Sequence, residues 1–301
     1  MTVTYASAQT PPRSEITHNE EYHGYFIQPA RLIRGAGLPW DHQIQVALPP
    51  SYFDSGKTYP VLWVTDGSFR FKWAIDTLTL SGIDQEMIIV AIGAPPAASA
   101  EMLKRRTYDF LPKVDIAKNN PELQKQIELS GLASNETGGG SDFVSFVTGA
   151  LRNDLGKRYL MSDDHVLYGS SQGGMFCVFA LFENAGAFKS YICNSPPLAY
   201  GDGMQFRAEQ QYARAHSDLA ANLFLSAGEG EILQGGTITP FHVVSSMSLM
   251  AETLKLRNYP SLKLNVKIFP DEIHHRWTST LSLRWALREL YHSPKSLNVK
   301  G

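Results

Sequence analysis

A serine stands at the centre of a G-x-S-x-G pattern in the segment YGSSQGGMF, residues 168–176. Gly169 and Gly173 flank this residue, Ser171. The apolar run HVLYG enters the pattern and MFCVFALF leaves it, which predicts a strand, a sharp turn and a helix. Such a turn needs glycines where Cβ atoms would collide, and it lifts the serine hydroxyl above the sheet at the positive end of the helix. This context favours a nucleophilic serine over the alternative, a chance match in a glycine-rich turn.

A nucleophilic serine needs a base, usually a histidine, and an acid that orients this base. When the serine occupies a turn of this type, the order along the chain is serine, acid, histidine. Five histidines lie downstream: His216, His242, His274, His275 and His292. His216 lies in a polar helical run and His292 follows the last helix, so we expect both in solvent. In VKIFPDEIHHRW a strand ends and a short loop carries His274 and His275 toward the terminal helix. One of this pair is the expected base, and the alternative for His275 is an exposed loop residue.

The acid that orients the base is expected after the preceding strand. NLFLSAGEGEIL supplies Glu229 and Glu231 there, directly after its apolar run. The pattern hardly separates the two, since either could be a solvated loop carboxylate; we favour Glu231. Asp271 and Glu272 neighbour the histidines and are interpreted as loop polarity.

Short apolar runs closed by turn residues alternate with segments of helical spacing, which predicts a mostly parallel sheet with helices on both faces. The expected strands lie in residues 43–52, 59–67, 86–96, 165–169, 190–195, 222–228 and 264–270. The expected helices lie in residues 141–159, 173–186, 245–259 and 278–291. We expect a single domain over 36–295, preceded by an irregular or strand-forming arm at 1–35. Residues 95–140 are expected to form loops over a cleft.

Composition excludes several classes of partner. The 301 residues are 43% hydrophobic and 19% charged with a formal charge of −2, so the chain offers no electrostatic attraction to nucleic acid or to an anionic membrane. A small-molecule partner is expected, and the oligomeric state is left open. Cys177 and Cys193 lie in apolar stretches, and we expect buried free thiols. We find no leader-like N-terminus and no long apolar span, so we expect a cytoplasmic protein.

Six segments of this chain occur in the order seen in a family of α/β-hydrolase esterases. This chain resembles the family that includes enterochelin (ferric siderophore) esterases, S-formylglutathione hydrolases, feruloyl esterases and mycolyltransferases, over about residues 40–292. The segments are VALPPSYFDSGKTYPVLWVTDG, RRTYDFLP, GGGSDFVSFV, YGSSQGGMFCVFALFENAGAFKSYICNSP, LFLSAGEGE and YPSLKLNVKIFPDEIHHRW. The resemblance implies the α/β-hydrolase fold.

The resemblance also assigns roles by position. The family's nucleophile falls on Ser171, its histidine on His274 in FPDEIH, and its acid on Glu231 in GEGE, where the family commonly has aspartate. The oxyanion-hole amides fall on Gln172, after the nucleophile, and on Ser68, after an early Asp-Gly. These residues imply ester hydrolysis through an acyl-serine, with no metal or organic cofactor.

Substrate contacts are less clearly marked in the sequence. Arg105 and Arg106 fall where siderophore esterases have an arginine near the cleft, and could clamp an acidic or catechol-like group; the alternative is a surface pair tied to Asp109. An aromatic wall could be built by three residues, each of which could equally be packing: Trp40, Phe69 and Trp277. We therefore expect a bulky or aromatic ester. Two other functions stay open: an acyltransferase using the same acyl-serine, and a noncatalytic hydrolase-like binding protein.

Overall fold

The computed structural model describes residues 16–17, 20–113, 124, 127–128, 130–132, 138–233 and 242–292. Among these residues, no helix is both long and apolar enough to cross a membrane.

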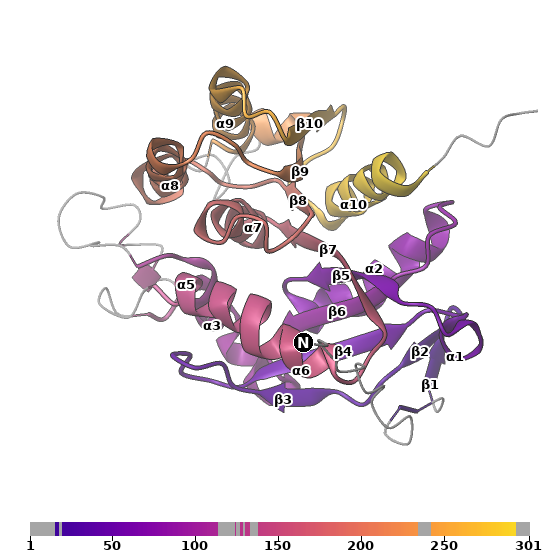
Figure 1. Cartoon of the computed structure of the whole chain (residues 1–301). Coiled ribbons are helices and arrows are strands. Elements are labelled where there is room, and N and C mark those ends of the chain that lie inside the picture. The colour runs from indigo at the N-terminus through magenta and orange to yellow at the C-terminus, as the bar shows by residue number, and fades with distance from the viewer. Residues whose placement is uncertain are drawn as a thin grey trace, which may run out of the picture.

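One twisted sheet organises the chain (Figure 1). Its strands run in the order β1-β2-β4-β6-β5-β7-β8-β9-β10, and β3 pairs with β4 off this path. β5 to β10 are parallel to one another, whereas β1 to β4 pair antiparallel, and β4 also pairs antiparallel with β6. The strand bounds are β1 Glu20–Tyr22, β2 Tyr25–Ile27, β3 Arg31–Ile33, β4 His42–Leu48, β5 Tyr59–Val64, β6 Ile88–Gly93, β7 Met161–Ser170, β8 Ser190–Asn194, β9 Ala221–Gly228 and β10 Leu262–Phe269. The predicted, mostly parallel sheet is confirmed.

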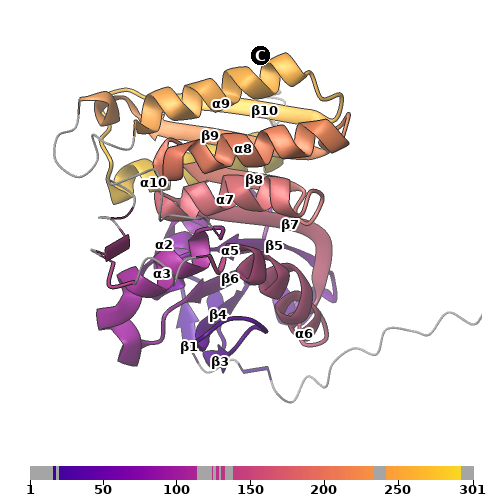
Figure 2. The same cartoon turned by 90° about the vertical axis from the view of Figure 1, so that its left-hand side faces the viewer.

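Helices cover both faces of this sheet. α2 and α10 bury their apolar residues against one face, and α5 to α9 cover the other, where Figure 2 shows α7, α8 and α9 side by side. The helix bounds are α1 Tyr52–Ser55, α2 Gly67–Leu80, η2 Pro96–Glu101, α3 Met102–Phe110, α5 Gly140–Ser145, η3 Phe146–Leu151, α6 Arg152–Gly156, α7 Gln172–Glu183, α8 Tyr200–Ala215, η4 Glu229–Ile232, α9 Val243–Arg257 and α10 Arg276–Tyr291. The central strands β5, β6 and β8 are almost wholly buried, as expected of parallel strands between two helical layers.

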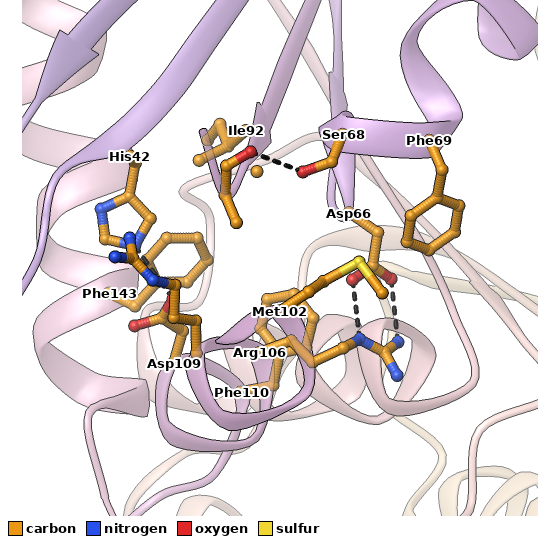
Figure 3. Close-up of a pocket in the computed structure, with 13 residues that line it drawn as sticks. His42, Asp66, Ser68, Phe69, Ile92, Met102, Arg106, Asp109, Phe110 and Phe143 are labelled. Carbon is orange, nitrogen blue, oxygen red and sulfur yellow. Dashed lines mark hydrogen bonds and ion pairs between the residues drawn. The ribbon is translucent and has the colours of Figure 1, made fainter. Parts of the chain in front are cut away.

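The segment expected as loops, 95–140, is helical in its first part, so that expectation is wrong there. Pro96 occupies the first position of η2, where its fixed φ suits a helix start, and α3 follows. α3 buries Asp109 and Phe110, and brings Arg106 to Asp66 at the edge of the sheet (Figure 3). Much of 114–137 lies outside the described residues.

The N-terminal arm expected at 1–35 does not stand apart from the domain. Within it, β2 and β3 both pair with β4 and so extend the main sheet, while residues 1–15 lie outside the described residues. The boundary near residue 36 therefore separates no structural unit among the described residues.

The expectation of two free thiols is also wrong, because Cys177 and Cys193 form a disulfide with their Cα atoms 5.5 Å apart. Cys177 lies on α7, and Cys193 lies on β8 beside Gly169 of β7. α7 packs on both of these strands, which brings together two thiols that are 16 residues apart in the sequence. Their apolar surroundings predicted burial correctly but not pairing.

Candidate active site

The turn between β7 and α7 holds Ser171 in a strained conformation. Its φ of 60° and ψ of −125° lie in a region that non-glycine residues seldom adopt. A Cβ at Gly169 would lie 2.0 Å from the carbonyl oxygen of Gly173, and a Cβ at Gly173 would lie 2.5 Å from Thr65 Oγ1. The Ser171 amide donates to the carbonyl of Asn194 at 3.0 Å, which ties the turn to the end of β8. The two glycines thus permit a turn too tight for side chains.

Four neighbouring strands deliver the polar groups of the site to one edge of the sheet. Ser171 follows β7, Ser195 follows β8, Glu231 lies in η4 after β9, and His274 follows β10. Because these strands are parallel and adjacent, their carboxyl ends meet at the same edge. Residues that are far apart in the sequence therefore lie side by side.

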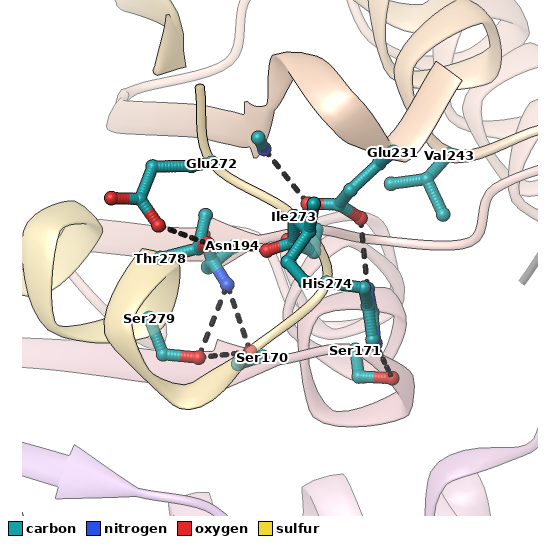
Figure 4. Close-up of polar contacts among 12 residues, drawn as sticks. Ser170, Ser171, Asn194, Glu231, Val243, Glu272, Ile273, His274, Thr278 and Ser279 are labelled. Atoms are coloured by element: carbon teal, nitrogen blue, oxygen red, sulfur yellow. Dashed lines mark hydrogen bonds and ion pairs between the residues drawn. The ribbon is translucent and has the colours of Figure 1, made fainter. Parts of the chain in front are cut away.

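Ser171, His274 and Glu231 form a continuous chain of contacts (Figure 4). His274 Nε2 lies 3.0 Å from Ser171 Oγ, and His274 Nδ1 lies 2.8 Å from Glu231 Oε2. An imidazole protonated on Nδ1 would donate to the carboxylate and present the lone pair of Nε2 to the serine hydroxyl. This arrangement can transfer a proton from the hydroxyl as its oxygen attacks a carbonyl carbon.

The Glu231 carboxylate is buried, and the oxygen that does not contact His274 accepts two hydrogen bonds. Its side chain is 0% exposed, and its Oε1 accepts hydrogen bonds from Ser195 Oγ and from the Gly228 amide, each at 2.7 Å. Glu229 behaves differently, because it is exposed and accepts from the Asp271 amide at 3.3 Å. The structure therefore separates the two glutamates that the sequence pattern could not.

Sequence reasoning missed Ser195, although its position carried a signal. It is the last residue of the expected strand 190–195 and directly follows β8, between the strands that lead to Ser171 and to Glu231. Its φ of 45° is another left-handed conformation of a non-glycine residue at this edge.

A buried polar network lies beneath Ser171. Asn194 Nδ2 donates to Ser170 Oγ at 2.9 Å and to Ser279 Oγ at 3.3 Å, and the two hydroxyl oxygens are 2.7 Å apart (Figure 4). The Tyr168 hydroxyl donates to the Ser279 carbonyl at 3.0 Å, and burial raises the pKa of that tyrosine. These contacts fix the first turn of α10, and with it the His274 loop, to β7 and β8.

A pocket of about 520 Å³ is lined by Ser171, and we call it the Ser171 pocket. Its wall includes Phe69, Arg70 and Trp73 of α2, of which only Phe69 was expected. Residues spaced by four lie on one face of a helix, so an expected helix over 67–80 would have placed Trp73 beside Phe69. The lining residues are Phe69, Arg70, Trp73, Ser170, Ser171, Asn194, Ser195, His274, His275, Arg276 and Ser279.

The backbone amides assigned to an oxyanion hole begin two helices. Gln172 is the first residue of α7, and Ser68 lies in the first turn of α2 after Asp66, whose φ is 58°. Amides in the first turn of a helix have no carbonyl partner within that helix. Ser68 Oγ donates to the Ala94 carbonyl at 2.8 Å (Figure 3), and Ser68 lines a neighbouring pocket rather than the Ser171 pocket. Phe69 lines both.

Arg105 and Arg106 line that neighbouring pocket and contact carboxylates of the chain itself. Arg106 Nε and Nη2 donate to the two oxygens of Asp66 at 2.8 and 2.9 Å (Figure 3), and Arg105 Nε donates to Glu101 at 3.2 Å. Asp109, the partner suggested by the alternative interpretation, contacts His42 Nε2 instead, at 2.9 Å. Neither arginine lines the Ser171 pocket.

The three aromatic residues expected to form one wall are dispersed. Phe69 is half exposed at the Ser171 pocket, whereas Trp40 packs edge-on against Tyr108 and donates from Nε1 to Asp109 at 3.2 Å. Trp277 is 59% exposed and lines an adjoining groove that shares Trp73 with the Ser171 pocket. His275 is exposed and caps α10, where its Nδ1 accepts from the Trp277 amide at 3.4 Å.

No group of three His, Cys, Asp or Glu side chains that could hold a metal ion occurs in the described ranges of the chain. The expected absence of a metal remains a prediction.

The fold and the turn around Ser171 are those of the α/β-hydrolase class. The siderophore hydrolase EstA from Aspergillus nidulans superposes with a TM-score of 0.72 at 21% sequence identity, over 88% of this chain and 93% of that one. An S-formylglutathione hydrolase from Agrobacterium tumefaciens superposes with a TM-score of 0.58 at 11% identity, over 90% of this chain and 96% of that one.

A family model described as "Putative esterase" matches residues 35–223, and the chain belongs to that family. The siderophore enterobactin esterase of Emericella nidulans is 28% identical over 170 residues, which make up 52% of this chain and 54% of that protein. The chain thus spans about half the length of the curated relatives it matches.

Proposed function

We propose that this protein is a serine esterase that hydrolyses carboxylic esters through an acyl-serine intermediate. The observation that carries the proposal is the continuous chain of contacts from Ser171 through His274 to the buried Glu231. His274 Nε2 takes the hydroxyl proton as Ser171 Oγ bonds to the ester carbonyl carbon. His274 then returns the proton to the departing alkoxide as the carbonyl re-forms.

The remaining groups of the proposed site stabilise charge. Glu231 holds the imidazole in the tautomer with Nδ1 protonated and stabilises the imidazolium that forms during attack. The amides of Gln172 and Ser68 stabilise the oxyanion, and since both are backbone groups, their side chains are free to vary. Water then attacks the acyl carbon with His274 as base, which releases the acid and restores the serine.

The proposed substrate is an ester with a bulky or aromatic group. Phe69 and Trp73 supply aromatic surface beside the nucleophile, and the adjoining groove extends it to Trp277. The relatives named siderophore esterases suggest a siderophore ester as one candidate of this class.

Hydrolysis of p-nitrophenyl esters of graded acyl size, together with an aromatic series, tests the proposal. We expect His274→Ala to abolish measurable turnover, while the matched variant His216→Ala stays within about three-fold of wild type, since His216 is an exposed residue at the end of α8 and does not line the Ser171 pocket. Equal losses of turnover in both variants would contradict the role of His274 as the base. A marked preference for acetyl esters of small alcohols would contradict the proposed substrate class.

Product analysis with an added alcohol separates hydrolysis from the open alternative of acyl transfer. Free acid as the sole product supports the esterase, whereas a new ester of the added alcohol identifies a transferase. A folded protein with neither product and no reaction at Ser171 would be a binding protein instead.

Cytoplasmic location stays a prediction of the sequence. The Cys177–Cys193 disulfide weighs against it, because disulfides persist mainly in oxidising compartments. Fractionation of the native cells decides the question.

A further inference from the structure

Arg70 is a buried cation in the wall of the Ser171 pocket. The residue is 7% exposed, yet it lines the pocket together with Ser171 and His274. Its guanidinium carbon lies 5.0 Å from the ring centroid of Phe69 and 5.2 Å from that of Trp73. A charge and two aromatic faces therefore meet at one side of the pocket.

The carboxylate nearest to Arg70 is already engaged. Asp66 has a side chain only 2% exposed, and both of its oxygens accept hydrogen bonds from Arg106, at 2.8 and 2.9 Å. Arg70 Nε lies 3.7 Å from Asp66 Oδ2, within ion-pair range but beyond hydrogen-bond range, and this one nitrogen has no hydrogen-bond partner, while the guanidinium also faces the Tyr168 hydroxyl. One carboxylate thus faces two guanidiniums, which leaves a net positive charge.

The Ser171 pocket adds positive charge and no negative charge. Arg276 also lines the pocket, and none of the described residues that line it carries a carboxylate. A buried cation is costly unless an anion pairs with it. An arginine fork pairs best with a planar carboxylate, through two parallel hydrogen bonds.

We propose that Arg70 is a specificity-determining residue that binds a carboxylate on the ester substrate, whose aromatic part lies against Phe69 and Trp73. This inference rests on the proposed esterase function and narrows its substrate class to anionic aromatic esters.

Two matched ester pairs test the proposal, one with the charge on the leaving alcohol and one with it on the acyl part. The first is 4-acetoxybenzoate against methyl 4-acetoxybenzoate; the second is phenyl hydrogen terephthalate against phenyl methyl terephthalate. The readout is the ratio of kcat/KM for the anionic ester to that for its neutral partner. We expect wild type to favour the anionic ester in at least one pair.

Arg70→Met should lower that ratio by about 10- to 100-fold, the range expected when a hydrogen-bonded charge is lost. The ratio for Arg70→Lys should lie between those of wild type and Arg70→Met, because lysine keeps the charge but lacks the two parallel donors of the guanidinium. Arg214→Met is the matched control, since it removes an exposed arginine of α8 and should leave the ratio unchanged.

A merely structural role for Arg70 predicts a different result. It would lower kcat/KM equally for both members of a pair, with the ratio unchanged, and that outcome overturns the proposal. If Arg70→Met does not fold, as judged by thermal unfolding, Arg70→Lys carries the same test.

A binding measurement separates this inference from the proposed esterase function. If wild type neither hydrolyses esters nor reacts with a fluorophosphonate, the esterase proposal fails. Calorimetry then compares the dissociation constants of 4-hydroxybenzoate and its methyl ester, which measures the preference for the anion without catalysis. An Arg70-dependent preference for the anion supports the inference, and its absence overturns it.

Discussion

Replacing Glu231 by glutamine tests how the hydrogen bonds around residue 231 set the tautomer of His274. Oε1 of Glu231 accepts from Ser195 Oγ and from the Gly228 amide, each at 2.7 Å, and Oε2 lies 2.8 Å from His274 Nδ1. In Glu231→Gln the amide oxygen must stay at the Oε1 position, because an NH₂ group there would face two donors.

The NH₂ group of the new glutamine then points at His274 Nδ1 and donates to it. The ring proton moves to Nε2, which lies 3.0 Å from Ser171 Oγ and can no longer accept the hydroxyl proton. Loss of the productive tautomer in a serine–histidine–acid triad costs about 10,000-fold in kcat. That factor corresponds to about 5 kcal/mol of transition-state stabilisation.

The assay is steady-state hydrolysis of a p-nitrophenyl ester by wild type, Glu231→Gln and Glu229→Gln, with thermal unfolding of each protein as a check of folding. Glu229→Gln is the matched control, because the Glu229 carboxylate is exposed and accepts a hydrogen bond from the Asp271 backbone amide at 3.3 Å. We expect it to stay within about three-fold of wild type. A folded Glu231→Gln variant whose kcat stays within about ten-fold of wild type would refute the tautomer argument.

Three further predictions concern stability. Gly169→Ala should prevent folding, since its Cβ would lie 2.0 Å from a backbone oxygen. Gly156→Ala, whose Cβ meets nothing within 4 Å, should raise the free energy of unfolding by up to about 1 kcal/mol. Urea titration measures both effects. Burial lowers the pKa of His165 to about 4 from 6.5, so the stability contributed by its neutral imidazole should be complete above pH 6.5 and be lost as the pH falls toward 4, by at most about 3 kcal/mol. Urea titrations at pH 5 and pH 7.5 should therefore show a larger change in the free energy of unfolding for wild type than for His165→Gln. An equal change in the two proteins would contradict the assignment. Reduction of the Cys177–Cys193 disulfide, which closes a loop of 16 residues, should lower the free energy of unfolding by about 3 kcal/mol, and unfolding that is insensitive to reductant would contradict this.

The sheet and the turn around Ser171 could be predicted because their signals are local. Buried parallel strands leave short apolar runs, and the elbow leaves glycines at fixed spacing between a strand and a helix. The choice between Glu229 and Glu231 could not be made this way, because it depends on which carboxylate turns inward beneath Ser195.

Other features depend on contacts that sequence periodicity does not show. The disulfide forms because α7 lies across β8, and the wall of the Ser171 pocket depends on α2, whose segment was not expected to be helical. Arg70 and Trp73 were missed for that reason. Arg106 lines a neighbouring pocket rather than the Ser171 pocket, and its fork contacts Asp66 of the chain itself.

Reaction with a fluorophosphonate, followed by intact-mass analysis and peptide mapping, tests the central claim most directly. The geometry around Ser171 predicts a single adduct on that serine in wild type, none in Ser171→Ala, and a strongly slowed reaction in Glu231→Gln. A folded wild-type protein that forms no adduct, or forms it on another residue, would contradict the assignment of Ser171 as the nucleophile.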